Sequence, residues 1–152
     1  METTDYTNIA EIEISYNPKI KPSRRPQITC SKDCYDIFLK TWDMGTILIQ
    51  EDFRIILLNR ANRVLGVRTI SRGGMTGTMA DPKIIFSIAL KGLAAGIVMA
   101  HNHPSNNLQP SNADNRLTEK IKKGGELLDI QVLDHIIITI QGYTSYADEG
   151  LI

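Results

Sequence analysis

The sequence Met-Ala-His-Asn-His-Pro, residues 99–104, contains two of the three histidines of the chain. The apolar run at residues 96–100 is typical of a buried strand. Because alternate side chains of a strand share a face, His101 and His103 are expected to project to the same side of a sheet. Pro104 ends the strand, since proline cannot donate a hydrogen bond to a sheet ladder. The stretch therefore predicts two imidazoles together at the end of a buried strand.

A serine and an aspartate follow this stretch at a spacing that suits metal binding. Asp114 comes eleven residues after His103, and Ser111 lies three residues before Asp114. Catalytic zinc usually takes three nitrogen or oxygen ligands from the protein and keeps a fourth position for water. The same serine and aspartate also read as a capping box at the start of a helix. Spacing alone leaves metal binding and simple loop polarity both open, and the cap is compatible with the ligand role.

The arrangement His-x-His, seven residues, Ser, two residues, Asp over residues 101–114 resembles the JAMM motif of zinc metalloproteases. The surrounding sequence, His-Asn-His-Pro-Ser and then Pro-Ser-x-Ala-Asp, is similar to the RadC branch of that superfamily. The likeness runs from about residue 47 to the C-terminus, roughly two-thirds of the chain. It includes Glu-Asp-Phe at 51–53, the glycine-containing loop at 74–77 and Leu-Asp-His at 133–135.

This resemblance implies a zinc ion held by His101, His103 and Asp114. It also implies that an upstream glutamate, here Glu51, acts as general base on the zinc-bound water, and that Ser111 donates a hydrogen bond to the developing oxyanion. The implied activity is that of a JAMM-type metallopeptidase, which hydrolyses an amide or isopeptide bond. No other cofactor is expected, and the peptide or protein substrate is not identified.

Two neighbouring residues are candidates for the general base. Glu51 matches the family position, but Asp52 is adjacent, and strand alternation would place the two carboxylates on opposite faces. On composition alone, a glutamate at such a junction is most often a solvated loop residue. Only the resemblance therefore assigns the role to Glu51.

Two residues near the end of the chain could support the site. His135 lies within the apolar run 131–140 and is expected to be a hydrogen-bonded core residue or a support for a metal ligand. The adjacent Asp134 is a weaker candidate for orienting a ligand histidine.

The order of the expected elements favours an α/β fold. Their order (strand, hairpin, helix, strand, helix, strand) predicts an α/β sandwich with one mixed sheet flanked by helices. The resemblance implies the JAMM-type fold, which is similar to the cytidine-deaminase architecture. Deamination is disfavoured, because the chain lacks the His-x-Glu and Pro-Cys-x-x-Cys signatures of the zinc deaminases. Besides the strand that ends at the histidines, strands are expected over residues 46–50, 53–59, 63–70 and 131–140, and helices over 32–42, from 82 onward and over 112–128, the last kinked at Gly124-Gly125.

Length and charge indicate one globular domain without a global electrostatic bias. Lys+Arg and Asp+Glu both number 17, which disfavours a general affinity for nucleic acid or anionic membranes. No apolar run has the length of a membrane span, and the N-terminus lacks the features of a signal peptide. Two cysteines in such a chain are expected to be reduced thiols. We therefore expect a cytoplasmic protein with no membrane partner.

Residues 1–30 are expected to form an N-terminal strand, at 9–16, and a basic, proline-rich arm. Residues 31–152 are expected to form the RadC-like JAMM domain, with its core over 46–152. The arm could pair between subunits and so support an oligomer. The resemblance suggests a cellular link to DNA repair or mobile elements, but residues 1–45 show no counterpart of the helix-hairpin-helix segment that usually precedes such domains.

The alternative function is a DNA- or protein-binding module whose zinc site is structural or inactive. DNA contact would depend on the basic residues of the arm, although exposed charges in a linker are usually only solvated. These residues are Lys19, Lys21, Arg24 and Arg25.

Overall fold

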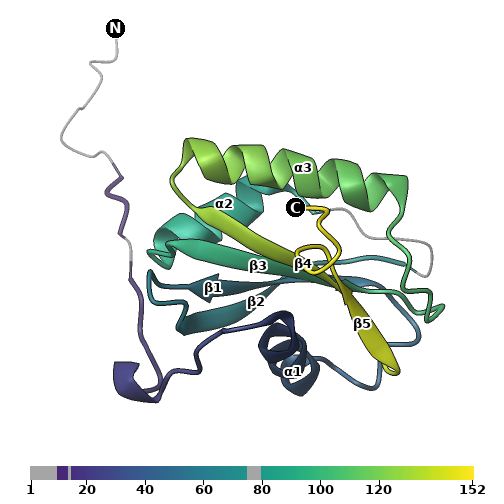
Figure 1. The fold of residues 1–152 in the computed structure, drawn as a ribbon. Coiled ribbons are helices and arrows are strands. Elements are labelled where there is room, and N and C mark those ends of the chain that lie inside the picture. The colour runs from purple at the N-terminus through teal and green to yellow at the C-terminus, as the bar shows by residue number, and fades with distance from the viewer. Residues whose placement is uncertain (1–9, 14, 75–79) are drawn as a thin grey trace, which may run out of the picture.

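The computed structural model describes residues 10–13, 15–74 and 80–152 and contains a sheet between two layers of helices (Figure 1). The predicted α/β fold, a mixed sheet flanked by helices, is confirmed. A single 3-10 turn, η1 (Pro22–Arg24), precedes the domain. The elements that follow are α1 (Ser31–Thr41), β1 (Asp52–Leu58), β2 (Val64–Arg72), α2 (Pro82–Lys91), β3 (Gly96–Asn102), α3 (Asn112–Leu127), β4 (Gln131–Thr139) and β5 (Gly142–Ser145).

The five strands in the described part of the chain lie in the order β2-β1-β3-β4-β5. β3 and β4 are parallel, whereas the other three neighbouring pairs are antiparallel. Parallel strands need a long crossover connection, and α3 provides it between β3 and β4. The start of α3 therefore lies beside the carboxyl end of β3, where the two histidines are found.

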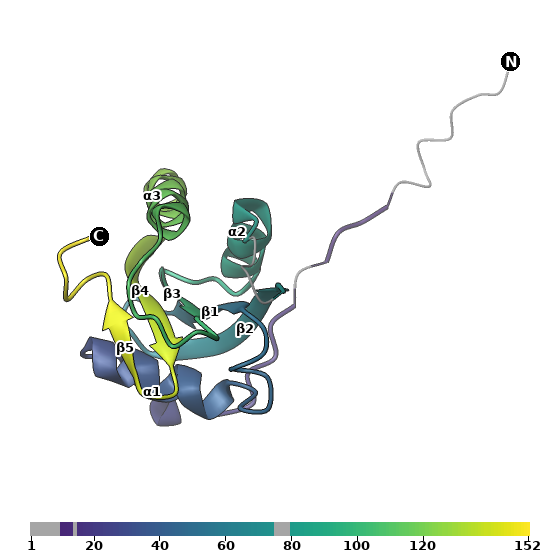
Figure 2. The ribbon, with the colours of Figure 1, turned by 90° about the vertical axis from the view of Figure 1, so that its right-hand side faces the viewer.

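Both faces of the sheet are covered. Figure 2 shows α1 on one side, with α2 and α3 on the other. Phe38 of α1 packs with Ile56 and Val98 on the first side, and Ile85 of α2 packs with Ile55 and Met99 on the second. All seven residues of β1 and all seven of β3 are buried, which explains the continuous apolar runs at residues 55–58 and 97–100.

The hairpin between β1 and β2 forms as the asparagines predict. Asn62 has a φ of 55°, a left-handed conformation that asparagine tolerates better than most residues. The side-chain oxygen of Asn59 accepts hydrogen bonds from the backbone N–H groups of Ala61 and Arg63. The turn therefore satisfies its own backbone.

The prediction of a strand at residues 46–50 is wrong. The backbone N–H groups of Ile49 and Gln50 both donate to the carbonyl of Thr46, which is the bonding of a tight turn. This turn buries Ile47 against the core and leaves Ile49 exposed. The β2 strand, in turn, continues to Arg72, two residues beyond its expected end, because Ser71 and Arg72 pair with the first residues of β1.

The N-terminal arm differs from the expected strand. Among its described residues, 10–13 and 15–18 form no strand, and the remaining residues of the expected strand, 9 and 14, lie outside the described part. Further along, the backbone of residues 26–28 bonds to the start of β2, and Ile28 is buried in the core. Within the described residues, no helix has both the length and the apolar character needed to cross a membrane.

The Gly124-Gly125 pair does not kink α3, which runs unbroken to Leu127. A Cβ atom on Gly124 would lie 2.6 Å from the ring of Phe86 in α2. A Cβ atom on Gly125 would overlap the backbone carbonyl of Ile130. Both glycines therefore allow close packing of α3 against its neighbours rather than bending the helix.

Candidate metal centre

The end of β3 brings His101 and His103 together as predicted. Ile97 and Met99 belong to the core under α2 and α3, so strand alternation places His101 on that same face. His101 is 1% exposed and His103 is partly buried. The two Nε2 atoms are 2.9 Å apart.

The first turn of α3 adds Asp114 to the histidines. Its Oδ1 lies 3.3 Å from Nε2 of His101 and its Oδ2 lies 3.8 Å from Nε2 of His103. The carboxylate also accepts a 2.7 Å hydrogen bond from the backbone N–H of Ser111, and the Ser111 hydroxyl accepts one from the Asp114 N–H. Asp114 therefore closes the capping box and faces the histidines at the same time.

The chemistry of these three side chains fits zinc. Nδ1 of His103 lies 2.5 Å from the carbonyl oxygen of Asn107, which only accepts, so Nδ1 carries a hydrogen and neutral His103 presents a bare Nε2. Ligands of tetrahedral zinc lie about 3.4 Å apart, given bonds of about 2.1 Å. The two Nε2 atoms are 2.9 Å apart, Oδ1 of Asp114 lies 3.3 Å from that of His101, and Oδ2 lies 3.8 Å from that of His103. These distances lie on both sides of the tetrahedral value. Two nitrogens and a carboxylate at this spacing leave room for a fourth ligand.

The electrostatics of the group favour a cation between its members. A hydrogen bond to Asp114 raises the pKa of His103, burial opposes this, and the Asn107 carbonyl and the charge of Glu51 add to the rise. Burial acts to raise the pKa of Asp114, but its contacts with the imidazoles of His101 and His103 outweigh burial and hold that pKa well below its usual range. The carboxylate therefore stays ionised and attracts a proton or a metal ion to the imidazoles.

Glu51 lies on the side of the sheet that faces this centre. Phe53, two residues later, lies under α2 and α3, and its ring stacks on that of His101 at a centroid distance of 6.3 Å. The backbone of Glu51 pairs with that of Gly73 and Gly74, which continues the β1–β2 ladder. The Glu51 charge also acts on the pKa of His103.

Asp52 is engaged on the other face of the sheet. Its carboxylate is 1% exposed and lies 3.1 Å from Nη2 of Arg54 and 3.6 Å from Nε of Arg72. Arg54 in turn lies over the ring of Trp42, on the α1 side. Asp52 is therefore turned away from the metal centre, whereas strand alternation with Phe53 places Glu51 on the face that carries His101.

A family model described as the RadC-like JAB domain matches residues 28–151. The chain belongs to this family. A UPF0758 protein of Flavobacterium johnsoniae is 42% identical over 125 residues, which are 82% of this chain and 53% of that protein. A UPF0758 protein of Porphyromonas gingivalis is 38% identical over 148 residues, 96% of this chain and 64% of that protein. The chain thus spans between half and two-thirds of the length of these relatives.

Asn102 is a buried polar residue of this RadC-like domain whose role the sequence did not reveal. It stands between the two histidines but points to the opposite face of the sheet, and it is fully buried. Its amide donates to the carbonyls of Ile47 and Gln50, and its oxygen accepts from the backbone N–H of Asp52. The signal that could have revealed it is a polar side chain on a face that is otherwise apolar.

His135 and Asp134 have different roles. His135 is completely buried, and its Nε2 lies 2.8 Å from Nδ1 of His101, as expected for a support of a ligand. Burial lowers its pKa well below the usual value, and the nearby His101 adds to that effect. Asp134 instead accepts hydrogen bonds from the Ser145 hydroxyl and from the backbone of Ala147, so the idea that it orients a ligand histidine is wrong.

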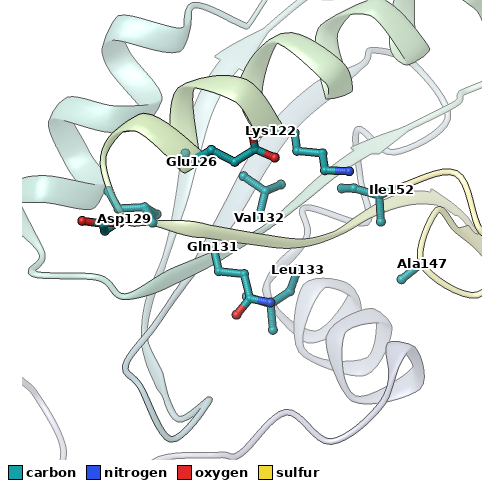
Figure 3. Close-up of a pocket in the computed structure, with 10 residues that line it drawn as sticks. Lys122, Glu126, Asp129, Gln131, Val132, Leu133, Ala147 and Ile152 are labelled. Atoms are coloured by element: carbon teal, nitrogen blue, oxygen red, sulfur yellow. The ribbon is translucent and has the colours of Figure 1, made fainter.

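A separate hollow lies away from the metal centre. A cavity of about 660 Å³ opens between the C-terminal half of α3 and the start of β4 (Figure 3). Lys122 and Glu126 of α3 and residues 131–133 of β4 line it, and none of the three candidate ligands does. Asp114 lies at the other end of α3, so this cavity is separate from the metal centre.

The four basic residues of the arm stay apart from the centre. Arg25 lies over the ring of Tyr16, whose hydroxyl donates to the carbonyl of Leu65 in β2. The other three, Lys19, Lys21 and Arg24, are exposed.

Proposed function

We propose that this chain is a zinc-dependent hydrolase of amide or isopeptide bonds, with His101, His103 and Asp114 as the metal ligands. The observation that carries the proposal is the convergence of three ligand atoms, from the end of β3 and the start of α3, within 4.8 Å of one another. Membership of a JAB-domain family supports the same assignment.

The roles of the remaining residues follow from where they lie. Zinc in a site of this kind acts as a Lewis acid and brings the pKa of a coordinated water near neutrality. Glu51, on the same face as His101, accepts the proton of the attacking water and passes it to the leaving nitrogen. Ser111 accepts a hydrogen bond from Asp114, and a hydroxyl that accepts can still donate its own hydrogen to a developing oxyanion.

The competing proposal is a binding module in which zinc only holds the fold together. In that case the ligands would be needed for stability, whereas Glu51 would be dispensable. A variant that retains the metal but lacks the base therefore separates the two proposals.

The first test is the metal content of the purified chain and of the His103→Ala variant, measured by elemental analysis. We expect about one zinc per chain, and much less in the variant, whose fold is checked by circular dichroism. Absence of bound metal after reconstitution with zinc would refute the proposal.

The second test compares zinc-loaded Glu51→Gln with zinc-loaded Glu119→Gln. Glu119 is exposed on α3 and pairs with Lys123, so its variant controls for the loss of one carboxylate. The probe is a set of quenched peptides together with one lysine-linked isopeptide. We expect Glu51→Gln to keep its zinc and to lose about 100-fold or more in rate, while the control is unchanged. Equal rates would refute the role of Glu51, and zinc binding without any hydrolysis of the set would favour the binding module.

A further inference from the structure

Thr118 lies one helical turn after Asp114 and is 3% exposed. Its hydroxyl donates a 2.7 Å hydrogen bond to the backbone carbonyl of Asp114. The same oxygen lies 2.6 Å from Nδ1 of His135. A hydroxyl has a single hydrogen, which here goes to the carbonyl, so the hydrogen between Thr118 and His135 belongs to the imidazole. Nδ1 of His135 is therefore a donor.

The surroundings of His135 determine the state of its other nitrogen. The ring is fully buried between Tyr146, at a centroid distance of 4.9 Å, and Phe53, at 5.6 Å. Among the described residues, neither ring nitrogen of His135 bonds to a carboxylate. A second ring hydrogen would create a buried charge with no paired anion, which is costly. Nε2 of His135 is therefore a bare acceptor.

The hydrogen of the next bond then belongs to His101. Its Nδ1 lies 2.8 Å from the bare Nε2 of His135, so Nδ1 of His101 is the donor. In a neutral imidazole with a hydrogen on Nδ1, Nε2 holds the free lone pair. That Nε2 is the atom that lies 3.3 Å from Asp114 and 2.9 Å from His103.

We propose that Thr118 and His135 are positioning residues that hold His101 in the Nδ1–H tautomer and aim its Nε2 lone pair at the metal centre. The contacts return to the metal centre, because the Thr118 hydroxyl donates to the backbone carbonyl of Asp114, which is itself a candidate ligand. One buried path thus joins β3, β4 and the first turns of α3. The tautomer follows from hydrogen bonding and from the burial of His135, whereas its importance for zinc rests on the proposed function.

The tautomer is tested in the metal-free protein by long-range ¹H–¹⁵N correlation spectra of the three imidazoles. Signals are assigned with His103→Ala and with His135→Gln. We expect the hydrogen on Nδ1 in both His101 and His135. A hydrogen on Nε2 of His135 would overturn the inference, whether or not the chain binds zinc.

The consequence is tested by zinc affinity, measured by competition with a chromophoric chelator. Thr118→Val removes the acceptor for His135 while keeping the shape of the side chain, and Thr118→Ser restores the hydroxyl. Thr139→Val is the matched control, because Thr139 is also buried and its hydroxyl donates to the carbonyl of Gly142 at the far end of β4.

We expect Thr118→Val to lower zinc affinity by roughly 10- to 100-fold, Thr118→Ser to restore most of it, and Thr139→Val to leave it unchanged. Equal affinities in the two valine variants would overturn the positioning role. If the unmodified chain binds no zinc, the proposed function fails, and the tautomer is still decided by the imidazole spectra.

Discussion

The side-chain oxygen of Asn102 lies 2.7 Å from the backbone nitrogen of Asp52 and accepts its hydrogen bond. The amide of Asn102 also holds the carbonyls of Ile47 and Gln50. The end of β3 thus places His101 on one face of the sheet. On the other face, Asn102 holds the segment that carries Glu51. The alternation of the strand therefore couples the candidate ligands to the candidate base.

We expect Asn102→Ala to displace Glu51 without removing the metal ligands. Hydrolysis should fall about 10- to 100-fold while zinc content stays the same, because small misplacements of a base are costly. The free energy of unfolding should fall by roughly 3 kcal/mol, since three buried backbone groups lose their partner. The measurements are turnover, elemental analysis and urea unfolding.

Asn59→Ala is the control for this experiment. Asn59 also bonds two backbone N–H groups, but in the β1–β2 turn. It should lose stability with unchanged zinc and turnover. Loss of zinc from a folded Asn102→Ala protein would contradict the prediction.

The pKa of His103 predicts opposite pH responses for the metal-free and zinc-bound protein. The hydrogen bond to Asp114 raises this pKa above its ordinary value of 6.5. In the metal-free protein, the protonated imidazole stabilises the fold below 6.5, and that stabilisation is lost as pH rises through the elevated pKa. Zinc must displace the same proton, so zinc affinity should rise across this window, by up to about tenfold per pH unit. Thermal unfolding and chelator competition between about pH 6 and 9 measure both responses.

His103→Ala should abolish the part of the metal-free pH dependence that His103 causes. A zinc affinity that does not change over the same window would contradict the prediction, because it would mean that no proton leaves the site on binding.

The two adjacent glycines of α3 should respond differently to alanine. In Gly125→Ala the new methyl group meets the backbone carbonyl of Ile130 and lies 2.9 Å from Cγ2 of Val132, so we expect a loss of about 2–3 kcal/mol. In Gly124→Ala the new methyl group meets only the outer edge of the Phe86 ring, which can shift. Because alanine is a better helix former than glycine by about 1 kcal/mol, we expect a smaller loss of stability than in Gly125→Ala. Urea unfolding of both variants checks the difference. Equal losses of stability in the two variants would contradict this expectation and would show that the α2–α3 contact is as rigid as the α3–β4 contact.

The two cysteines should differ in reactivity. Burial raises the pKa of the Cys34 thiol to about 12, whereas Cys30, just before α1, is exposed. A thiol reagent near neutral pH should therefore label Cys30 quickly and Cys34 only when the protein unfolds. The Cys30→Ser variant should show no fast labelling. Fast labelling of that variant would mean that α1 opens readily in the native state.

The sequence by itself determined the candidate ligands and the class of fold. Two histidines two residues apart on a strand share a face, and a capping box places Asp114 at a helix start. Only the resemblance to the JAMM motif joined the three residues into one expected site. The order of apolar runs was likewise enough to predict a mixed sheet flanked by helices, because most runs indicate their own element, and the run at residues 46–50 is the exception.

Only the tertiary structure decided what supports these residues. The turn at residues 46–50 depends on Asn102, more than fifty positions later, and the unbroken α3 depends on contacts with Phe86 and Ile130. The path from His101 to Thr118 passes through His135, on a strand that the crossover brings alongside. Such contacts join side chains that are distant along the chain, and no local pattern of polarity encodes which buried donor meets which acceptor once the sheet has formed.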